Sequence, residues 1–445
     1  LGLIKQIAAK HDPVELREAQ DAEEAGRIWL GRKSAFGAMG QINDYMCLDG
    51  TIPVSSLPFV LRRIGELSEE FGLEVGNVFH AGDGNMHPLI LFDANKPGDL
   101  ETCEEMGAEI LKLCVEVGGC LTGEHGVGIE KRDLMNVQFA PGDLEIQMRV
   151  KDVFDPAWLL NPAKVFPLEN SAGRRAPADA AAYSPDWGLS APKPPRILRP
   201  KRRTGRVIEP TTEQEIAEAV RDATGPLSIR GGGTRGMAPT QGDAFSLAQV
   251  SGISLYDPGA LTLVAGAGTP MSEIEAALQS EGQMLPFEPM DHRALLGTSG
   301  APTIGGVVGA NVSGPRRLRA GGCRDSLIGV RFVDGRGDVL KNGGRVMKNV
   351  TGYDLVKLLS GSYGTLGVLS EVSFKLLPKP DATGVVILQG LSLSDGVAAM
   401  SAALGSPFEV SGAAMTPGAN GAASRVMLRL EGFETSVKYR GEHLT

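Results

Sequence analysis

The sequence predicts an α+β protein made of two main units joined by a linker. In the first half, an apolar stretch with a turn at its centre (residues 77–93) precedes a long helical pattern at 98–118. In the second half, a short apolar run ends in a glycine cluster, and later apolar runs flank a helical pattern at 271–281. Between the halves, the chain is rich in Ala, Pro and Arg and has little apolar periodicity, which is typical of a linker.

These patterns divide the chain into four parts. We expect a first domain at residues 1–167, a linker at 168–203 and a second domain at 204–381. Residues 382–445 read as the start of another unit that is too short to complete a core. A chain of 445 residues is long enough for about two to four domains.

Composition and charge exclude several classes of protein. The chain is 42% apolar with a formal charge of -9, which argues against nucleic acid as a partner. No apolar run reaches the roughly 18 residues needed to cross a bilayer, and no signal peptide is visible. The five cysteines are odd in number and form no C-x-x-C pair, so we expect reduced thiols, a cytoplasmic protein and no iron–sulfur site. Because the first residue is not Met, we expect the chain to begin inside a larger gene product.

Two helices are predicted before the first motif. Residues 22–37 form one of them and carry Arg32, which is read equally well as a solvated helix charge or as a clamp for a substrate carboxylate. The second lies within residues 53–71, where Val60, Leu61, Ile64 and Leu67 recur at helical spacing. This apolar stripe predicts a core face and no chemistry.

The first stretch with chemical content contains two histidines around a tight turn. Asp-Gly-Asn at 83–85 separates two apolar runs, which predicts a strand, a turn and a strand with His80 and His87 near one end of the sheet. Neutral imidazoles bind zinc and similar ions. The helix at 98–118 then leads to Glu124, a candidate carboxylate ligand, and to His125, a candidate general base. The alternative is a set of unrelated surface or core residues. Three of the six histidines lie in these two glycine-rich turns, which favours a site.

The second half is organised around residues 230–236, Arg-Gly-Gly-Gly-Thr-Arg-Gly, which follow a strand ending near residue 229. Exposed backbone N–H groups in such a loop can bind a diphosphate without a cationic side chain. A simple turn is the competing interpretation. A second glycine cluster at 303–314, small and apolar, favours the ligand because a flat group can pack against it. Further predictions are a helix start at 210–216, a strand at 261–268 and a hairpin at 328–340.

Specific stretches carry a resemblance to a known family. Residues 283–289 (Gln-Met-Leu-Pro-Phe-Glu-Pro), 314–317 (Gly-Pro-Arg-Arg) and 346–355 (Val-Met-Lys-Asn-Val-Thr-Gly-Tyr-Asp-Leu), with the glycine clusters and the 361–368 run, resemble the FAD-binding domain of the vanillyl-alcohol oxidase / p-cresol methylhydroxylase flavoproteins. Within that family the likeness is to the E-type subunit of glycolate oxidase. The first half resembles the C-terminal substrate cap of the D-type subunit, through residues 31–33, 80–87, 123–126 and 161–166.

The resemblance implies a fold and an order of domains. The fold is a FAD-binding PCMH-type α+β domain preceded by a ferredoxin-like α+β substrate cap of the FAD-linked oxidase C-terminal type. In the family the FAD domain precedes the cap, whereas here a cap comes first. We therefore expect a fusion of two neighbouring genes, truncated at both ends.

The resemblance also implies cofactors and site residues. The residues expected to contact FAD are Gly231, Gly232, Gly233, Thr234 and Gly236 at the pyrophosphate, Gly305 and Gly306 opposite, and Gly364, Thr365 and Val368 along the flavin. No histidine stands at the nest position where some relatives tether flavin, so the FAD is expected to be non-covalent. The implied ligands of a divalent metal, zinc or manganese, are His80, His87 and Glu124.

For the substrate, the resemblance implies that Asn85 contacts it, His125 is the base and Arg32 matches a carboxylate-binding arginine. Phe36 stands where relatives have Thr. The implied activity is FAD-dependent oxidation of a small 2-hydroxy acid, glycolate to glyoxylate or D-lactate, with electrons passed to a partner subunit. The alternative is a non-catalytic, flavin-binding scaffold. The implied partners are other glycolate oxidase subunits, including an iron–sulfur subunit, and the implied location is cytoplasmic with at most peripheral contact to the inner membrane.

Overall fold

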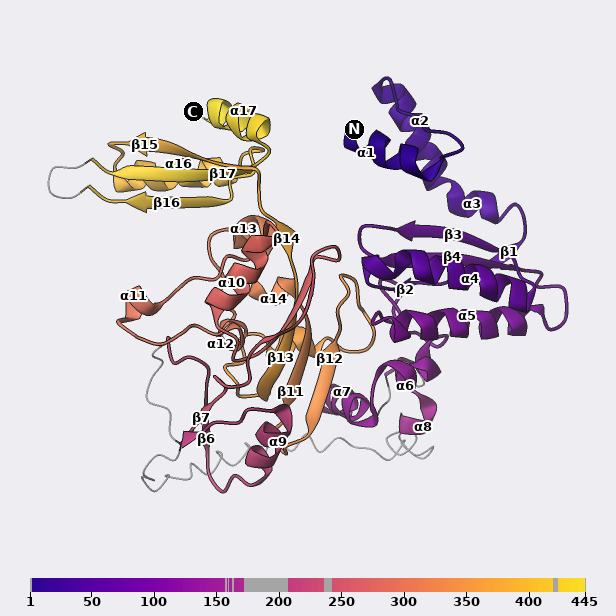
Figure 1. Ribbon diagram of the computed structural model, residues 1–445, viewed down its shortest axis with the longest axis horizontal. Coiled ribbons are helices and arrows are strands. Elements are labelled where there is room, and N and C mark those ends of the chain that lie inside the picture. Colours follow the sequence, from indigo (N-terminus) through magenta and orange to yellow (C-terminus); the bar gives the residue numbers. More distant parts are fainter. Residues whose placement is uncertain are drawn as a thin grey trace.

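The computed structural model of the chain describes residues 2–156, 158, 160–161, 164–171, 207–235, 242–418 and 423–444, and the side chains of residues 32 and 33 also lie outside the description. Most of the expected linker at 168–203 therefore lies outside the described residues. The first half, the second half and the C-terminal unit each surround a separate hydrophobic core (Figure 1). The fold is α+β, as the sequence predicts. No helix in the described ranges combines the length and the apolar character needed to cross a membrane.

The first half contains an antiparallel sheet covered by two helices. Its strands are β1 (Asp44–Cys47), β2 (Gly50–Thr51), β3 (Val75–His80) and β4 (Asn85–Phe92), and β4 pairs with each of the other three. Helices α4 (Leu57–Phe71) and α5 (Asp99–Glu116) bury Val60, Ile64, Met106 and Ile110 in the core below the sheet. The predicted hairpin and both of these helices are confirmed.

Short helices precede and follow this sheet. Those before it are α1 (Gly2–Ala8), η1 (Ala9–His11), α2 (Ala22–Lys33) and α3 (Ala35–Met39), and η2 (Val54–Ser56) leads into α4. The single helix expected at 22–37 is interrupted at Ser34. Those after it are η3 (Arg132–Leu134), α6 (Met135–Gln138), α7 (Pro141–Phe154) and α8 (Leu168–Ser171). Helix α7 joins the two halves, because Asp143 accepts a hydrogen bond from the Lys341 N–H at 2.6 Å.

The second half contains one parallel and one antiparallel sheet. The parallel sheet has the order β5 (Val207–Ile208), β7 (Asp243–Ser246), β6 (Leu227–Arg230). The antiparallel sheet has the order β12 (Val339–Gly343), β11 (Leu327–Val333), β13 (Val368–Lys375), β9 (Thr262–Gly266), β8 (Ile253–Asp257). Strands β10 (Gln283–Met284) and β14 (Leu377–Pro378) form a separate two-stranded sheet in this half. The expected strand at 261–268 and hairpin at 328–340 are confirmed.

Several helices accompany these sheets. They are α9 (Glu213–Arg221), α10 (Met271–Ser280), α11 (Arg293–Leu296), α12 (Ile304–Gly309), α13 (Arg317–Ala320), α14 (Cys323–Ser326) and α15 (Leu355–Leu359). Thr212 caps α9 by accepting a hydrogen bond from the Glu215 N–H, as the start signal at 210–216 predicts. The apolar glycine cluster at 303–314 forms α12, whose first turn is capped by Thr303.

The C-terminal unit forms a separate three-stranded sheet above the second half (Figure 1). Strands β15 (Ala382–Gln389), β17 (Arg425–Gly432) and β16 (Gly412–Thr416) lie in that order, all antiparallel, with helices α16 (Leu393–Leu404) and α17 (Glu434–Leu444). This unit has a small core of its own, although the sequence suggested that it was too short for one. The order strand–helix–strand–strand–helix, with the first strand beside the third, is also the order of β1, α4, β3, β4 and α5 in the first half.

Candidate functional site

The hairpin and the turn after α5 bring three predicted ligands together. His80 ends β3 and pairs with Asn85 across the turn, while His87 follows two residues later on the same face of β4. The Nε2 atom of His87 lies 3.6 Å from a carboxylate oxygen of Glu124. The ligand atoms of His80, His87 and Glu124 all lie within 4.8 Å of one another. The structure therefore assembles the set that the sequence suggested.

Ring orientations distinguish this set from a second one. Cys47, His87 and His125 also place their ligand atoms within 4.8 Å. A metal bound by two imidazoles lies near both ring planes, because it takes the in-plane lone pair of each ring nitrogen. The rings of His80 and His87 are nearly perpendicular, at 79°, so their planes cross close by. The rings of His87 and His125 are stacked at 24° with centroids 5.5 Å apart, which does not suit one shared ion.

The protonation of His87 also fits a metal ligand. Its Nδ1 atom lies 3.1 Å from the carbonyl oxygen of Leu48, which accepts the ring N–H and leaves Nε2 with its lone pair. Burial lowers the pKa of His87 and favours the neutral imidazole. The donor set of two imidazoles and one carboxylate is one that zinc accepts.

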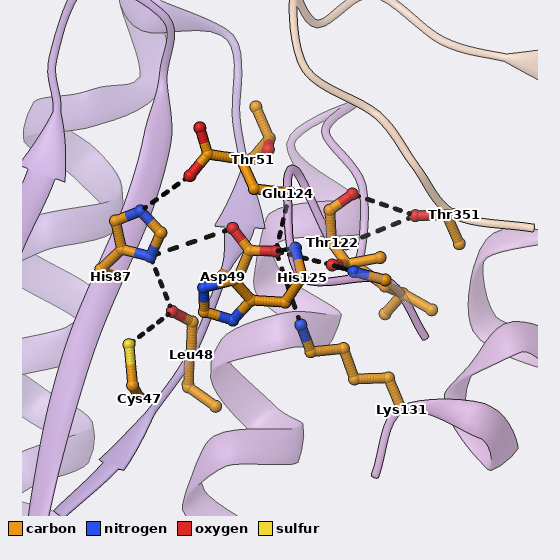
Figure 2. Close-up of polar contacts among 12 residues, drawn as sticks. Cys47, Leu48, Asp49, Thr51, His87, Thr122, Glu124, His125, Lys131 and Thr351 are labelled. Carbon is orange, nitrogen blue, oxygen red and sulfur yellow. Dashed lines mark hydrogen bonds and ion pairs between the residues drawn. The ribbon is translucent and has the colours of Figure 1, made fainter. Parts of the chain in front are cut away.

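A buried aspartate, Asp49, holds the turn that carries Glu124 and His125. Its Oδ2 atom accepts hydrogen bonds from the Thr122 hydroxyl at 2.6 Å and from the backbone N–H groups of Glu124 and His125 at 2.9 and 2.7 Å (Figure 2). Burial raises the pKa of Asp49, but the hydroxyl and the two N–H groups outweigh it, and the pKa lies below the ordinary value. The Nζ atom of buried Lys131 lies 3.7 Å from the same oxygen. Asp49 thus positions both site residues through the main chain.

The other residues that the sequence predicts near the substrate differ in burial and in their distance from His87. Asn85 is fully buried, and its Nδ2 atom lies 3.5 Å from His87 Nε2. His125 is exposed beside His87, outside the favoured ligand set, so its ring nitrogens are accessible. The ring of Phe36 meets that of His87 edge-on at 6.3 Å, so α3 covers this side of the site. Arg32 lies in α2, and its side chain lies outside the description.

A separate cavity of about 280 Å³ lies in the second half, where β6 ends. The predicted FAD residues that line it are Gly231, Gly232, Gly233, Thr234, Gly305, Gly306 and Gly364. Thr365 and Val368 are not among the lining residues, and Gly236 lies outside the described residues. Tyr363, Leu369 and Arg235 also line the cavity.

Two glycines of this loop lie so close to residues 301–303 that a side chain would not fit. A Cβ at Gly232 would overlap the carbonyl oxygen of Ala301, and one at Gly231 would overlap the Thr303 hydroxyl. Gly233 has φ +69°, a conformation that favours glycine. The loop therefore presents main chain rather than side chains to the cavity, which fits a cradle for a diphosphate.

Arg235 adds a charge that the sequence analysis did not single out. Burial lowers the pKa of its guanidinium, and its Nε atom is buried with no hydrogen-bond partner in the described part of the chain. A buried N–H donor without an acceptor is costly, and an anionic ligand in the cavity would supply that acceptor. The sequence did contain a signal for Arg235 as a ligand-binding residue, because Arg235 directly follows Thr234 of the glycine loop.

Comparisons with known proteins assign both halves to types of flavoprotein domain. Residues 1–165 match the family of FAD linked oxidases, C-terminal domain, and residues 205–343 match the FAD binding domain family. The stretch that is similar to an oxidase C-terminal domain thus precedes the stretch that is similar to a FAD binding domain.

Individual relatives match different parts of the chain. Glycolate oxidase subunit GlcD of Escherichia coli is 53% identical over 165 residues, which are 37% of this chain and 33% of that protein. Glycolate oxidase subunit GlcE of Escherichia coli is 39% identical over 233 residues, which are 52% of this chain and 63% of that protein. D-lactate dehydrogenase [cytochrome], mitochondrial, of Arabidopsis thaliana is 29% identical over 168 residues, 37% of this chain and 30% of that protein. The chain spans about a third of the first protein and less than two thirds of the second.

Proposed function

We propose that the chain is a FAD-dependent oxidoreductase for small 2-hydroxy acids, with glycolate, oxidised to glyoxylate, as the simplest substrate and D-lactate as another. The observation that carries the proposal is the assembly of His80, His87 and Glu124 beside an accessible His125, in a chain that also contains a FAD-binding domain. The names of the relatives, two glycolate oxidase subunits and a D-lactate dehydrogenase, agree with a 2-hydroxy acid.

The residues have distinct roles in this proposal. His80, His87 and Glu124 hold a divalent ion, zinc or manganese, and Asn85 contacts the substrate beside His87. His125 accepts the proton of the substrate hydroxyl while the hydrogen on the adjacent carbon leaves as hydride, so that the alcohol carbon becomes a carbonyl. When bound, the ion supplies Lewis acidity at the hydroxyl oxygen and FAD supplies the two-electron acceptor.

The glycine loop and Arg235 hold the FAD without a covalent bond. The diphosphate is bound by main-chain N–H groups of residues 231–234 and by the Arg235 guanidinium. Gly305 and Gly306 face the diphosphate from the opposite side in this proposal, and Gly364 lies along the flavin; all three line the cavity. Gly236, Thr365 and Val368 remain in the proposed set from the sequence alone.

The proposal extends to partners and organisation. Electrons leave to other subunits of a glycolate oxidase, one of them an iron–sulfur subunit, and the protein is cytoplasmic or peripheral to the inner membrane. Residues 1–167, 204–381 and 382–445 are a cap, a FAD domain and part of a second cap, united by gene fusion.

The test is flavin reduction in the purified chain. The protein is loaded with FAD and Mn²⁺, made anaerobic and mixed with glycolate or D-lactate. Loss of absorbance near 450 nm, prevented when the ion is removed with a chelator, supports the proposal. Bound flavin that stays oxidised with both substrates refutes catalysis by this chain alone.

One observation favours the second candidate, a non-catalytic flavin-binding scaffold. Every residue that lines the cavity belongs to the second half, whereas the histidine site belongs to the first. A scaffold would bind FAD stoichiometrically and copurify with partner subunits, yet leave glycolate unoxidised even with an added artificial acceptor. Turnover by the isolated chain rejects it. A third possibility, metal-dependent hydrolysis, leaves the second half without a role.

A further inference from the structure

A segment of the second half lies on the turn that carries Glu124. The Val350 N–H donates to the Thr122 carbonyl at 3.1 Å, and the Cys120 thiol donates to the Lys348 carbonyl at 3.4 Å. The Thr122 N–H also donates to the Thr351 hydroxyl at 3.3 Å, a contact visible at the edge of Figure 2. These bonds, made between residues more than 200 positions apart, fix the backbone of residues 348–351 next to the histidine site.

The ammonium group of Lys348 enters the site from this segment. Its Nζ atom lies 2.6 Å from Glu124 Oε1 and 3.1 Å from Asp83 Oδ2. Asp83 belongs to the turn between His80 and Asn85, so the ammonium joins the two turns that carry the candidate ligands. The Lys348 side chain is 25% exposed, which leaves it accessible to a small ligand. Two of its three N–H donors serve these carboxylates, and a third remains for another acceptor.

The charge balance of the site points to an anionic ligand. Asp83 and Glu124 contribute two negative charges, and Lys348 contributes one positive charge. A divalent ion held by Glu124 and the neutral imidazoles would leave one positive charge in excess. It would also place two cations on the same carboxylate, an arrangement that a bridging anion relieves. A 2-hydroxy acid is such an anion, with a carboxylate for the ammonium and a hydroxyl for the ion.

We propose that Lys348 binds the substrate carboxylate, so that the substrate site is completed by a residue from the FAD-binding half. This inference rests on the proposed function. Lys348 sets the preference for an acid over the corresponding neutral alcohol, and it couples substrate binding to the contact between the halves. In the competing interpretation, Lys348 only fastens the halves together through Glu124 and Asp83.

The experiment measures ligand binding apart from catalysis. The probe is 2-hydroxyisobutyrate, which has the hydroxyl and the carboxylate but no hydrogen on the alcohol carbon and therefore cannot be oxidised by hydride loss. Its dissociation constant is measured by calorimetry on the full chain loaded with FAD and Mn²⁺, for wild type, Lys348→Met and Lys348→Arg. The matched control is Arg345→Met, which removes a cation of the same segment that lies against Gly118, outside the site.

The expected results distinguish a Lys348 that binds the substrate carboxylate from one that only connects the two halves. Lys348→Met should raise the dissociation constant about 10- to 100-fold, as the loss of one charge-assisted hydrogen bond does, and Lys348→Arg should restore most of the affinity. Affinity for Mn²⁺ should stay equal or increase in Lys348→Met, because a cation that competes for Glu124 is gone. Arg345→Met should bind both as wild type does.

Three outcomes overturn the inference. They are unchanged 2-hydroxyisobutyrate affinity in Lys348→Met, a parallel loss of Mn²⁺ affinity that shows a collapsed site, and an equal loss of ligand affinity in Arg345→Met. Failure of the proposed function is a different result: glycolate leaves the flavin oxidised although 2-hydroxyisobutyrate binds through Lys348.

Discussion

Replacing Gly305 by alanine adds a single methyl group to one wall of the cavity where FAD is proposed to bind. A Cβ at Gly305 would lie 2.7 Å from both the Cβ and the carbonyl oxygen of Ala267, whereas nonbonded carbon atoms prefer about 3.5–4.0 Å. Ala267 is 1% exposed, and its N–H donates to the Ser370 carbonyl at 2.8 Å. We therefore expect α12 to move away from Ala267 by about 1 Å.

The magnitude follows from this displacement. Overpacking costs about 1–3 kcal/mol, and alanine in place of glycine within a helix returns up to about 1 kcal/mol. The free energy of unfolding should therefore fall by up to about 2 kcal/mol if the helix gain is complete, and by up to about 3 kcal/mol without it. The same shift would disturb the packing contact that this wall is proposed to make with FAD. A loss of about 1–3 kcal/mol of binding free energy from that contact would raise the FAD dissociation constant about 10- to 100-fold.

The assay is titration of the apoprotein with FAD, followed by flavin fluorescence, together with urea unfolding. Gly309→Ala lies in the same helix with nothing within 4 Å of the new Cβ, so its stability should not fall. Gly335→Ala, in the open β11–β12 turn, is the control for FAD affinity. If Gly305→Ala binds FAD as tightly as wild type, the packing of α12 does not shape the binding site and the reasoning is wrong.

Three further predictions test other parts of the molecule. His80→Ala should lose Mn²⁺ binding in calorimetry, whereas His125→Ala should keep the ion and slow flavin reduction by glycolate about 10²- to 10⁴-fold in stopped flow; equal effects of the two changes would contradict their separate roles. The guanidinium of Arg429 holds the pKa of Glu288 below its usual range, so the stability from this pair is present above the unfolded pKa of about 4.3 and is lost as pH falls through the lower folded value. Pepsin should therefore cleave the C-terminal unit increasingly below about pH 4, and Glu288→Gln should flatten that dependence. Burial raises the pKa of Cys114 to about 12, so iodoacetamide at about pH 8 should label this thiol only after unfolding, as mass spectrometry of tryptic peptides can show.

Local signals in the sequence predicted the secondary structure near the site well. Asp-Gly-Asn between two apolar runs is enough to specify the hairpin of β3 and β4, because turn chemistry and strand alternation act over a few residues. The pairing of His80 with Asn85 follows from that turn, and it places His87 on the same face. The break at Ser34 was missed because nothing in residues 22–37 is a strong helix terminator.

Contacts over long distances in the chain carried no such signal. Asp49 lies 73 positions before Thr122, and its role appears only when the antiparallel bridge between Thr51 and Cys120 brings the two segments together. Lys348 lies 224 positions after Glu124. Neither residue stands in a motif for metal or substrate binding, and each acts through a partner that only the tertiary fold supplies. Arg235 differs, because it adjoins the glycine loop and a charge beside a diphosphate cradle is a visible signal.

The strand–helix–strand–strand–helix arrangement occurs twice in the chain, and the two occurrences differ in the residues at the start of the hairpin. In the first copy, the hairpin begins with the pair His80 and Asn85, whereas the corresponding pair in the second copy is Thr416 and Arg425. At this closing pair, the described part of the second copy thus has neither an imidazole nor a carboxylate. The same layout thus carries the candidate ligands in the first half, whereas in the C-terminal unit it provides a folded body that the ion pair between Arg429 and Glu288 attaches to the second half.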